Sequence, residues 1–96
     1  MESKMESKRV IITVIGRDRV GIIAAVANAL ADNQVNILDI SQTVLQEFFT
    51  MMMIVDLSQS PLGIQELQDI MEKLGEKIGM RIHAQHEDIF RYMHRI

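Results

Sequence analysis

The chain has 96 residues, enough for one domain with one modest hydrophobic core. Hydrophobic residues make up 48% of it, which excludes a disordered chain, and the lack of cysteine excludes disulfides and thiolate metal sites. The net charge of -3 gives no general attraction to phosphate backbones, and no apolar run approaches the ~20 residues of a membrane span. We therefore expect a soluble cytoplasmic protein with neither nucleic-acid nor membrane partners.

The N-terminal part of the chain predicts a flexible segment followed by a strand. Residues 1–8 read MESKMESK, a polar tetrapeptide written twice, and we expect no fixed structure there. Residues 9–15 are β-branched and apolar, which favours a strand that ends at Gly16. Successive side chains of a strand point to opposite faces, so residues 10, 12 and 14 share one face of the sheet.

A helix of about 13 residues is predicted next. Asp18 is a good N-cap because its carboxylate can accept hydrogen bonds from free N–H groups of the first turn. Asn33 is suited to a left-handed cap at the other end. Gly21 falls in the first turn, where glycine costs up to about 1 kcal/mol relative to alanine, so it either relieves crowding against the sheet or opens the backbone to a ligand. The apolar stripe of this helix consists of Ile23, Val26, Ala27 and Leu30.

Two further strands are predicted at residues 35–45 and 48–57. The connection at Gln46 and Glu47 is so short that the strands should form an antiparallel hairpin. The second strand should carry one apolar face and one mostly polar face. Its apolar face is predicted to hold Leu38, Ile40 and Val44. The third strand is apolar on both faces, and one of them holds Phe49, Met51, Met53, Val55 and Leu57.

The last part of the domain predicts a second helix and a fourth strand. Pro61 suits a helix start, and Gly79 is a natural stop. Between them apolar residues recur at helical spacing: Ile64, Leu67, Met71, Leu74 and Ile78. Residues 80–86 then alternate between apolar and polar side chains, as a half-buried strand does.

The element order β-α-β-β-α-β predicts an α+β ferredoxin-like sandwich, in which a four-stranded antiparallel sheet carries both helices on one face. No predicted helix of the domain covers the other face. That face is nevertheless predicted to carry Ile11, Ile15, Phe48, Met52 and Ile54. Exposed apolar patches of this kind mark a partner or a covering segment. Residues 87–96 are predicted to form a short helix, which would need to dock on this sheet or on a second subunit because so short a helix is marginal in water.

The loop after the first strand does not match a nucleotide-binding motif. Gly16 and Gly21 have the spacing of two phosphate-loop glycines, but Ile22 stands where that motif requires lysine. His83 and His86 lie three apart on a predicted strand and should face opposite ways, which opposes a shared metal ion. We therefore expect no metal and no cofactor.

The sequence also shows no recognisable set of catalytic side chains. No nucleophile, base and acid can be placed together, and no two carboxylates share a face, so we do not expect an enzyme. Acylphosphatases share the predicted topology and need an arginine in the first loop. Arg17 or Arg19 can supply one, but the loop is not that family's glycine-rich pattern.

Two motifs flank the alanine-rich first helix. The loop reads G-x-D-R-x-G-I over residues 16–22, and the second strand begins V-N-I-L-D-I over residues 35–40. Together they resemble the signature of the ACT domain, and the likeness extends over about residues 9–86, which we take as the domain. It is closest to small standalone ACT-domain proteins of unassigned function. These are related to the ACT modules of glycine cleavage system repressors and formyltetrahydrofolate deformylases.

The resemblance implies a non-catalytic regulatory protein, at least a homodimer, that binds a small amino-acid-like ligand and signals to an enzyme or regulator. In the family, the ligand sits between the first strand–helix loop of one subunit and the start of the second strand of another. Carried over to this chain, the ligand-binding residues are Asp18, Val20, Gly21, Ile22, Asn36, Ile37 and Leu38. Two other interpretations stay open: a ligand-free protein–protein assembly module and an acylphosphatase-like hydrolase.

Overall fold

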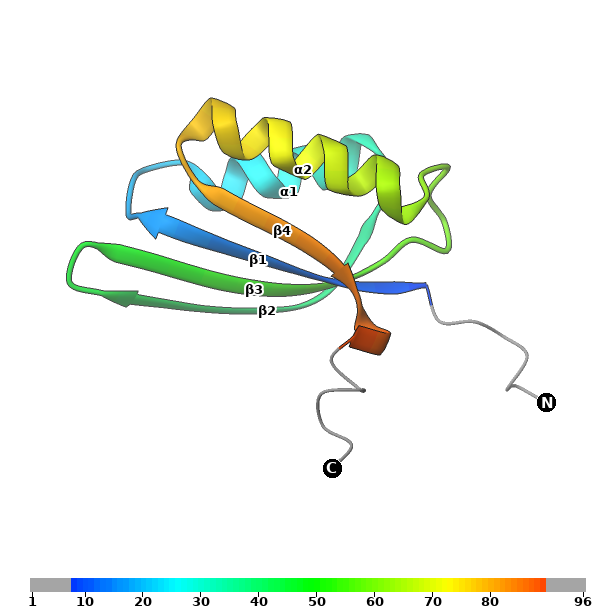
Figure 1. Cartoon of the computed structure of the whole chain (residues 1–96), viewed down its shortest axis with the longest axis horizontal. Helices are drawn as coiled ribbons and strands as arrows, with labels where there is room; N and C mark the ends of the chain where they lie inside the picture. The colour runs from blue at the N-terminus through cyan, green and yellow to red at the C-terminus, as the bar shows by residue number, and fades with distance from the viewer. Residues whose placement is uncertain (1–7, 90–96) are drawn as a thin grey trace.

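The computed structural model describes residues 8–89, which form one sheet with both helices on the same face (Figure 1). The elements are β1 (Arg9–Arg17), α1 (Ile22–Asp32), β2 (Asn36–Leu45), β3 (Phe48–Asp56), α2 (Ile64–Ile78) and β4 (Arg81–His86). Neighbouring strands are antiparallel in the order β2-β3-β1-β4. This confirms the predicted ferredoxin-like fold. The predicted N-terminal segment up to residue 7 and the predicted C-terminal helix from residue 90 onward lie outside the described residues.

The hydrophobic core lies between the sheet and the two helices. Alternate residues of β1 and β3 point into it, as the strand patterns predicted, and the predicted buried face of β3 is confirmed. Burying each large apolar side chain contributes roughly 1.5–3 kcal/mol, so this layer is the main source of stability. The side chains that are completely buried include Val10, Ile12, Val14, Met51, Met53 and Val55 from the sheet and Val26, Leu30 and Met71 from the helices.

The start of α1 differs from the prediction. The strand before it does not end at Gly16, because Gly16 and Arg17 still pair with β3. The helix begins at Ile22 with Gly21 as its N-cap, so Asp18 lies too far from the first turn to cap it, and its assignment as N-cap is wrong. The predicted apolar stripe is confirmed at Val26 and Leu30, but it starts at Ile22, which is 3% exposed, and not at Ile23, which is 37% exposed.

The end of α1 also differs in detail. Asn33 is the C-cap but has φ −107°, so it is not left-handed as predicted. Gln34 takes the left-handed conformation instead, with φ 60°. The side chain of Asn33 turns back and donates a hydrogen bond from Nδ2 to the carbonyl of Ala29 over 2.8 Å. Asn33 and Gln34 together therefore reverse the direction of the chain between α1 and β2.

A β-bulge in β2 overturns the predicted division of its faces. Ile37 pairs with Val55 and Asp39 pairs with Ile54, so Leu38 is an extra residue between them. An extra residue shifts the alternation of side chains by one. Ile37 therefore joins Ile40 and Val44 on the helix side of the sheet, and Leu38 leaves that face.

The second helix starts later than Pro61 predicted. It begins at Ile64, and the carboxylate of Glu66 accepts a hydrogen bond from the N–H of its N-cap, Gly63, over 2.6 Å. The stop at Gly79 is confirmed, with φ 75°. Near this end α2 packs very closely on β4: a Cβ added to Gly75 would lie 2.5 Å from the carbonyl oxygen of Met80.

Candidate functional site

The loop between β1 and α1 is exposed but held at two points. The N–H of Asp18 donates to the carbonyl of Glu47 in the β2–β3 hairpin over 2.8 Å. Arg19 donates from Nη1 to the carbonyl of Ile78, the last residue of α2, over 2.7 Å. The β1–α1 loop, the β2–β3 hairpin and the connection from α2 to β4 all lie at the same end of the sheet, at the left of Figure 1. These two bonds fix where the loop delivers the chain into α1.

The N-terminus of α1 is open. Among residues 8–89, no side chain caps it, and its first turn has no acidic residue. Its N-cap, Gly21, has φ 92°, a left-handed conformation that glycine adopts without strain. A Cβ added there would meet no described atom within 4 Å, so the crowding explanation for this glycine is wrong. The first N–H groups of α1 carry partial positive charge and suit a carboxylate or another anion.

The predicted ligand-binding residues differ in what they can offer. Val20 is completely exposed at the tip of the loop. The side chain of Ile22 is buried in the core, so only its backbone N–H can reach a ligand. On β2, Asn36 and Leu38 are exposed, whereas Ile37 packs partly against the core.

The two groups of predicted residues are not brought together within one chain. Residues 18–22 lie before the first turn of α1 and in it, and residues 36–38 lie just beyond its last turn. The 11 residues of α1 span about 16 Å, so the helix separates the groups. Figure 1 shows the two groups at opposite ends of the sheet. A single site containing both groups therefore requires two copies of the chain.

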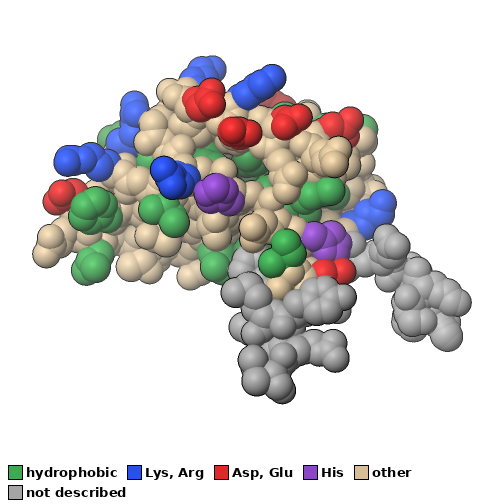
Figure 2. Space-filling view, viewed as in Figure 1, with side chains coloured by type: hydrophobic (Ala, Val, Ile, Leu, Met, Phe, Trp, Pro, Cys, Tyr) green, Lys and Arg blue, Asp and Glu red, His purple; other side chains and the backbone are tan. Residues whose placement is uncertain are grey.

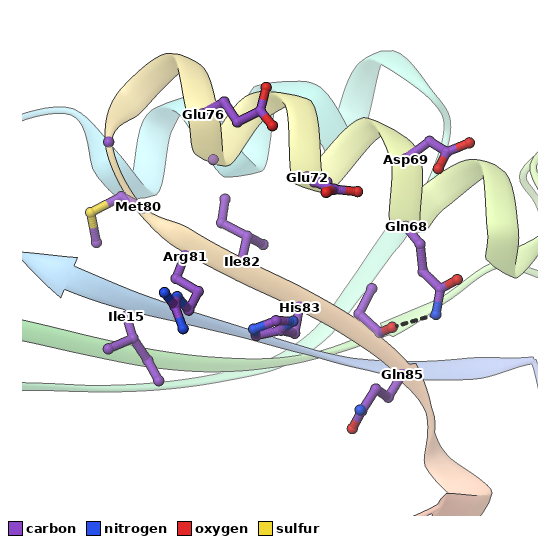
Figure 3. A pocket seen from close by; sticks show the side chains of 13 residues that line it. Ile15, Gln68, Asp69, Glu72, Glu76, Met80, Arg81, Ile82, His83 and Gln85 are labelled. Carbon is purple, nitrogen blue, oxygen red and sulfur yellow. Dashed lines mark hydrogen bonds between the residues drawn. The ribbon is translucent and has the colours of Figure 1, made fainter.

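A groove of about 950 Å³ between α2 and β4 was missed by the sequence reasoning. Figure 3 shows α2 above it and β4 below it, joined where Gln68 Nε2 donates to the carbonyl of Ala84 over 2.8 Å. Figure 2 shows acidic side chains gathered over α2 above this groove. The sequence signal was the set of acidic residues between the apolar positions of α2, including Asp69, Glu72 and Glu76, which indicates a solvated helix face. None of the predicted ligand-binding residues lines the groove, which is lined by Asp69, Glu72, Glu76, Arg81 and His83 among others.

The structure bears on metals, membranes and the hydrolase alternative. No group of three or more metal-ligating side chains that could hold an ion is present within residues 8–89, where His83 and His86 lie on opposite faces of β4 as predicted. In the same part of the chain, no helix is both long and apolar enough to cross a membrane. Arg19, one of the two arginines considered for phosphate binding, is directed to the carbonyl of Ile78.

Comparison with known proteins identifies the family. The sequence profile described as ACT domain matches residues 8–85. The chain belongs to the ACT domain family. It is 50% identical over 88 residues to a UPF0237 protein of Methanocaldococcus jannaschii, covering 92% of this chain and 98% of that protein. The solved ACT domain protein from Streptococcus pneumoniae is 40% identical, with a TM-score of 0.78 and coverage of 88% of this chain and 96% of its own.

A more distant likeness shows the fold alone. The crystal structure of a putative glycine cleavage system transcriptional repressor is 24% identical, with a TM-score of 0.72, covering 82% of this chain and 45% of that one. Membership of the ACT domain family indicates a regulatory role, and such domains commonly bind amino acids.

Proposed function

We propose that this ACT domain protein is a non-catalytic regulator that binds a small amino-acid-like ligand between two copies of the chain. The observation that carries the proposal is the uncapped N-terminus of α1, presented by a loop that Asp18 and Arg19 hold in place. An α-carboxylate there would accept hydrogen bonds from the first N–H groups of α1, including that of Ile22. Gly21 leaves the approach to these groups free of side-chain atoms.

The second half of the site would come from β2 of the partner copy. Among the described strands, β2 has a neighbour on one side only. Its helix-side residues Ile40 and Val44 stay 42% and 51% exposed, because α1 and α2 do not cover them. Antiparallel pairing of two β2 edges would place the start of one β2 beside the end of the other, at the end of the sheet that holds the loop. Asn36 of the partner would then offer its amide to the ligand beside the α1 N-terminus.

The signal would pass to another protein, an enzyme or a regulator, through a change in this two-chain assembly. The family indicates regulation, and the structural neighbour described as a transcriptional repressor is a precedent for such an output. We also propose that the protein acts in the cytoplasm.

Titration calorimetry of the full chain against the twenty amino acids tests ligand binding. We expect one or a few amino acids to bind, and Gly21→Val to lower the affinity at least tenfold, because valine both strains the left-handed backbone and blocks the N–H groups. The matched control is Gly63→Val, at the N-cap of α2, whose φ is −90°. If no amino acid binds while the chain still associates, the ligand-free assembly module replaces this proposal.

Mixing two defective variants tests whether the site lies between subunits. Gly21→Val damages the loop half and Asn36→Ala the β2 half, so each variant alone should bind poorly. A mixed dimer would pair the intact loop of one copy with the intact β2 of the other. Random exchange of equal amounts should therefore restore about a quarter of the sites. Asn28→Ala, an exposed asparagine of α1, is the control, and no recovery on mixing would place both halves in one chain.

A further inference from the structure

The sheet face away from the helices, the open face, has an apolar centre. It is formed by residues of the two central strands, β1 and β3. Ile15 is 48% exposed, Phe48 53% and Met52 44%, while Ile11 and Ile54 are half-buried. Ile11 pairs directly with Ile54, whereas Met52 and Ile15 pair with Thr13 and Thr50, so the strip is apolar with two threonines within it. A strip of this kind on a small domain marks an interface.

The two edge strands flank this strip with polar side chains of different character. On β2 the open-face residues accept hydrogen bonds or carry negative charge: Asp39, Ser41 and Thr43, which pair with Ile54, Met52 and Thr50. On β4 they are donors, two of them basic: Arg81, His83 and Gln85, which pair with Ile15, Thr13 and Ile11. The open face is therefore apolar in the middle, with an acceptor column at one edge and a donor column at the other.

We propose that the open face binds the open face of a second copy, about a two-fold axis that runs parallel to the strands between β1 and β3. This rotation lays the apolar strip on itself and places the acceptor column over the partner's donor column. Ile54 would lie over the partner's Ile11, and Asp39 over the partner's Gln85. A two-fold axis perpendicular to the strands would instead place each column on itself, so that Arg81 would face the partner's β4 side chains rather than the acceptors of β2. Sheets that pack face to face commonly align their strands within about 30°, and both axes satisfy this, so the edge columns decide between them.

The size of the open face limits the area that this contact can bury. A sheet of four strands about 4.8 Å apart, with about eight residues per strand facing the partner, measures roughly 20 by 25 Å. Each copy would bury roughly 500 Å², or about 1,000 Å² in total, the lower limit for a specific interface. We therefore expect a reversible dimer that forms at micromolar concentration. The contact leaves the outer edge of β2 free, so it is independent of the proposed ligand site, and both contacts together would give a tetramer.

Sedimentation velocity of the full chain from 1 to 100 µM tests the contact. Met52→Lys places a cation beside the two-fold axis, where it meets apolar atoms and its own symmetry mate, and should weaken this association at least tenfold. The control is Gln65→Lys, which adds the same charge on an exposed position of α2. Because Met52 is nearly half exposed in one chain, the substitution should leave the thermal midpoint of the monomer nearly unchanged. Unaltered association of Met52→Lys would overturn the proposal.

A charge exchange identifies the partner as a second copy in this orientation. Gln85→Glu sets glutamate against the partner's Asp39, and the double variant Asp39→Lys, Gln85→Lys sets lysine against lysine. Each like-charge contact occurs twice in a symmetric dimer, so each variant alone should associate about tenfold more weakly. Their equimolar mixture turns both contacts into ion pairs and should restore association as a mixed dimer. A mixture no better than its components would overturn the arrangement.

Shortening the chain to residue 89 tests the remaining alternative, in which residues 90–96 of the same chain occupy the open face. If the open face binds a second copy, the shortened chain should associate as the full chain does. If residues 90–96 occupy the face, shortening should change the association constant, and the proposal would be wrong.

Discussion

Arg19 in the β1–α1 loop donates a hydrogen bond from Nη1 to the carbonyl oxygen of Ile78 over 2.7 Å, across 59 residues of sequence. Ile78 is the last residue of α2, where the free carbonyl groups carry partial negative charge and favour a cation. The bond therefore joins the loop before α1 to the C-terminal end of α2. It gives the loop proposed to bind a ligand a direct connection to the second helix.

Arg19→Ala should lower the free energy of unfolding by about 0.5–1 kcal/mol, because one charge-assisted but exposed hydrogen bond is lost. Urea unfolding measures this. Ligand affinity should fall together with stability, since the loop loses one of its two tethers. Arg17→Ala, an exposed residue two positions earlier, is the control. An Arg19→Ala protein of unchanged stability would show that the bond contributes nothing in solution.

Gly21→Ala should destabilise the protein by about 1–2 kcal/mol through backbone strain alone. The residue has φ 92°, and an added Cβ meets no described atom within 4 Å, so no steric contact contributes. The matched substitution Gly63→Ala, where φ is −90°, should change stability by much less. Thermal unfolding of the two variants side by side makes the comparison, and equal losses would contradict the strain argument.

Gly75→Ala should destabilise by about 1–3 kcal/mol although alanine favours helices. The added Cβ would lie 2.5 Å from the backbone oxygen of Met80, so α2 and β4 must move apart. The control is Glu76→Ala, at the next position on an exposed part of the helix. A stabilised Gly75→Ala protein, measured by urea unfolding, would mean that helix propensity outweighs the close packing.

Glu66→Ala should cost about 1 kcal/mol by removing the carboxylate that accepts the N–H of Gly63 over 2.6 Å. Glu72→Ala, an exposed glutamate in the middle of α2, should have little effect. Thermal unfolding compares the two. Similar midpoints for both variants would show that the cap is not needed to start α2.

Much of the fold could be predicted because its signals are local. The alternation of Met51, Met53 and Val55 indicates a strand with a buried face, and the spacing of Leu67 and Met71 indicates a helix on the core. Both patterns express the geometry of a single element, so neighbouring residues suffice to show them. The errors lie at element ends and irregularities, at Asp18, at Asn33 and at the bulge of β2. There, contacts between distant residues decide the backbone.

For the candidate site, the sequence by itself determined the motif around Gly21 and the residue types available at the start of β2. The sequence also placed these two groups on either side of the first helix, and the tertiary structure fixed that helix at Ile22–Asp32, whose length keeps the groups apart within one chain. Only the structure, likewise, assigned Gly21 to a left-handed N-cap, since β1 continues past Gly16 by pairing with β3, the loop is then held by the hydrogen bond from Asp18 to Glu47, and α1 starts at Ile22. That bond joins residues 29 positions apart, and no local pattern of side chains encodes it.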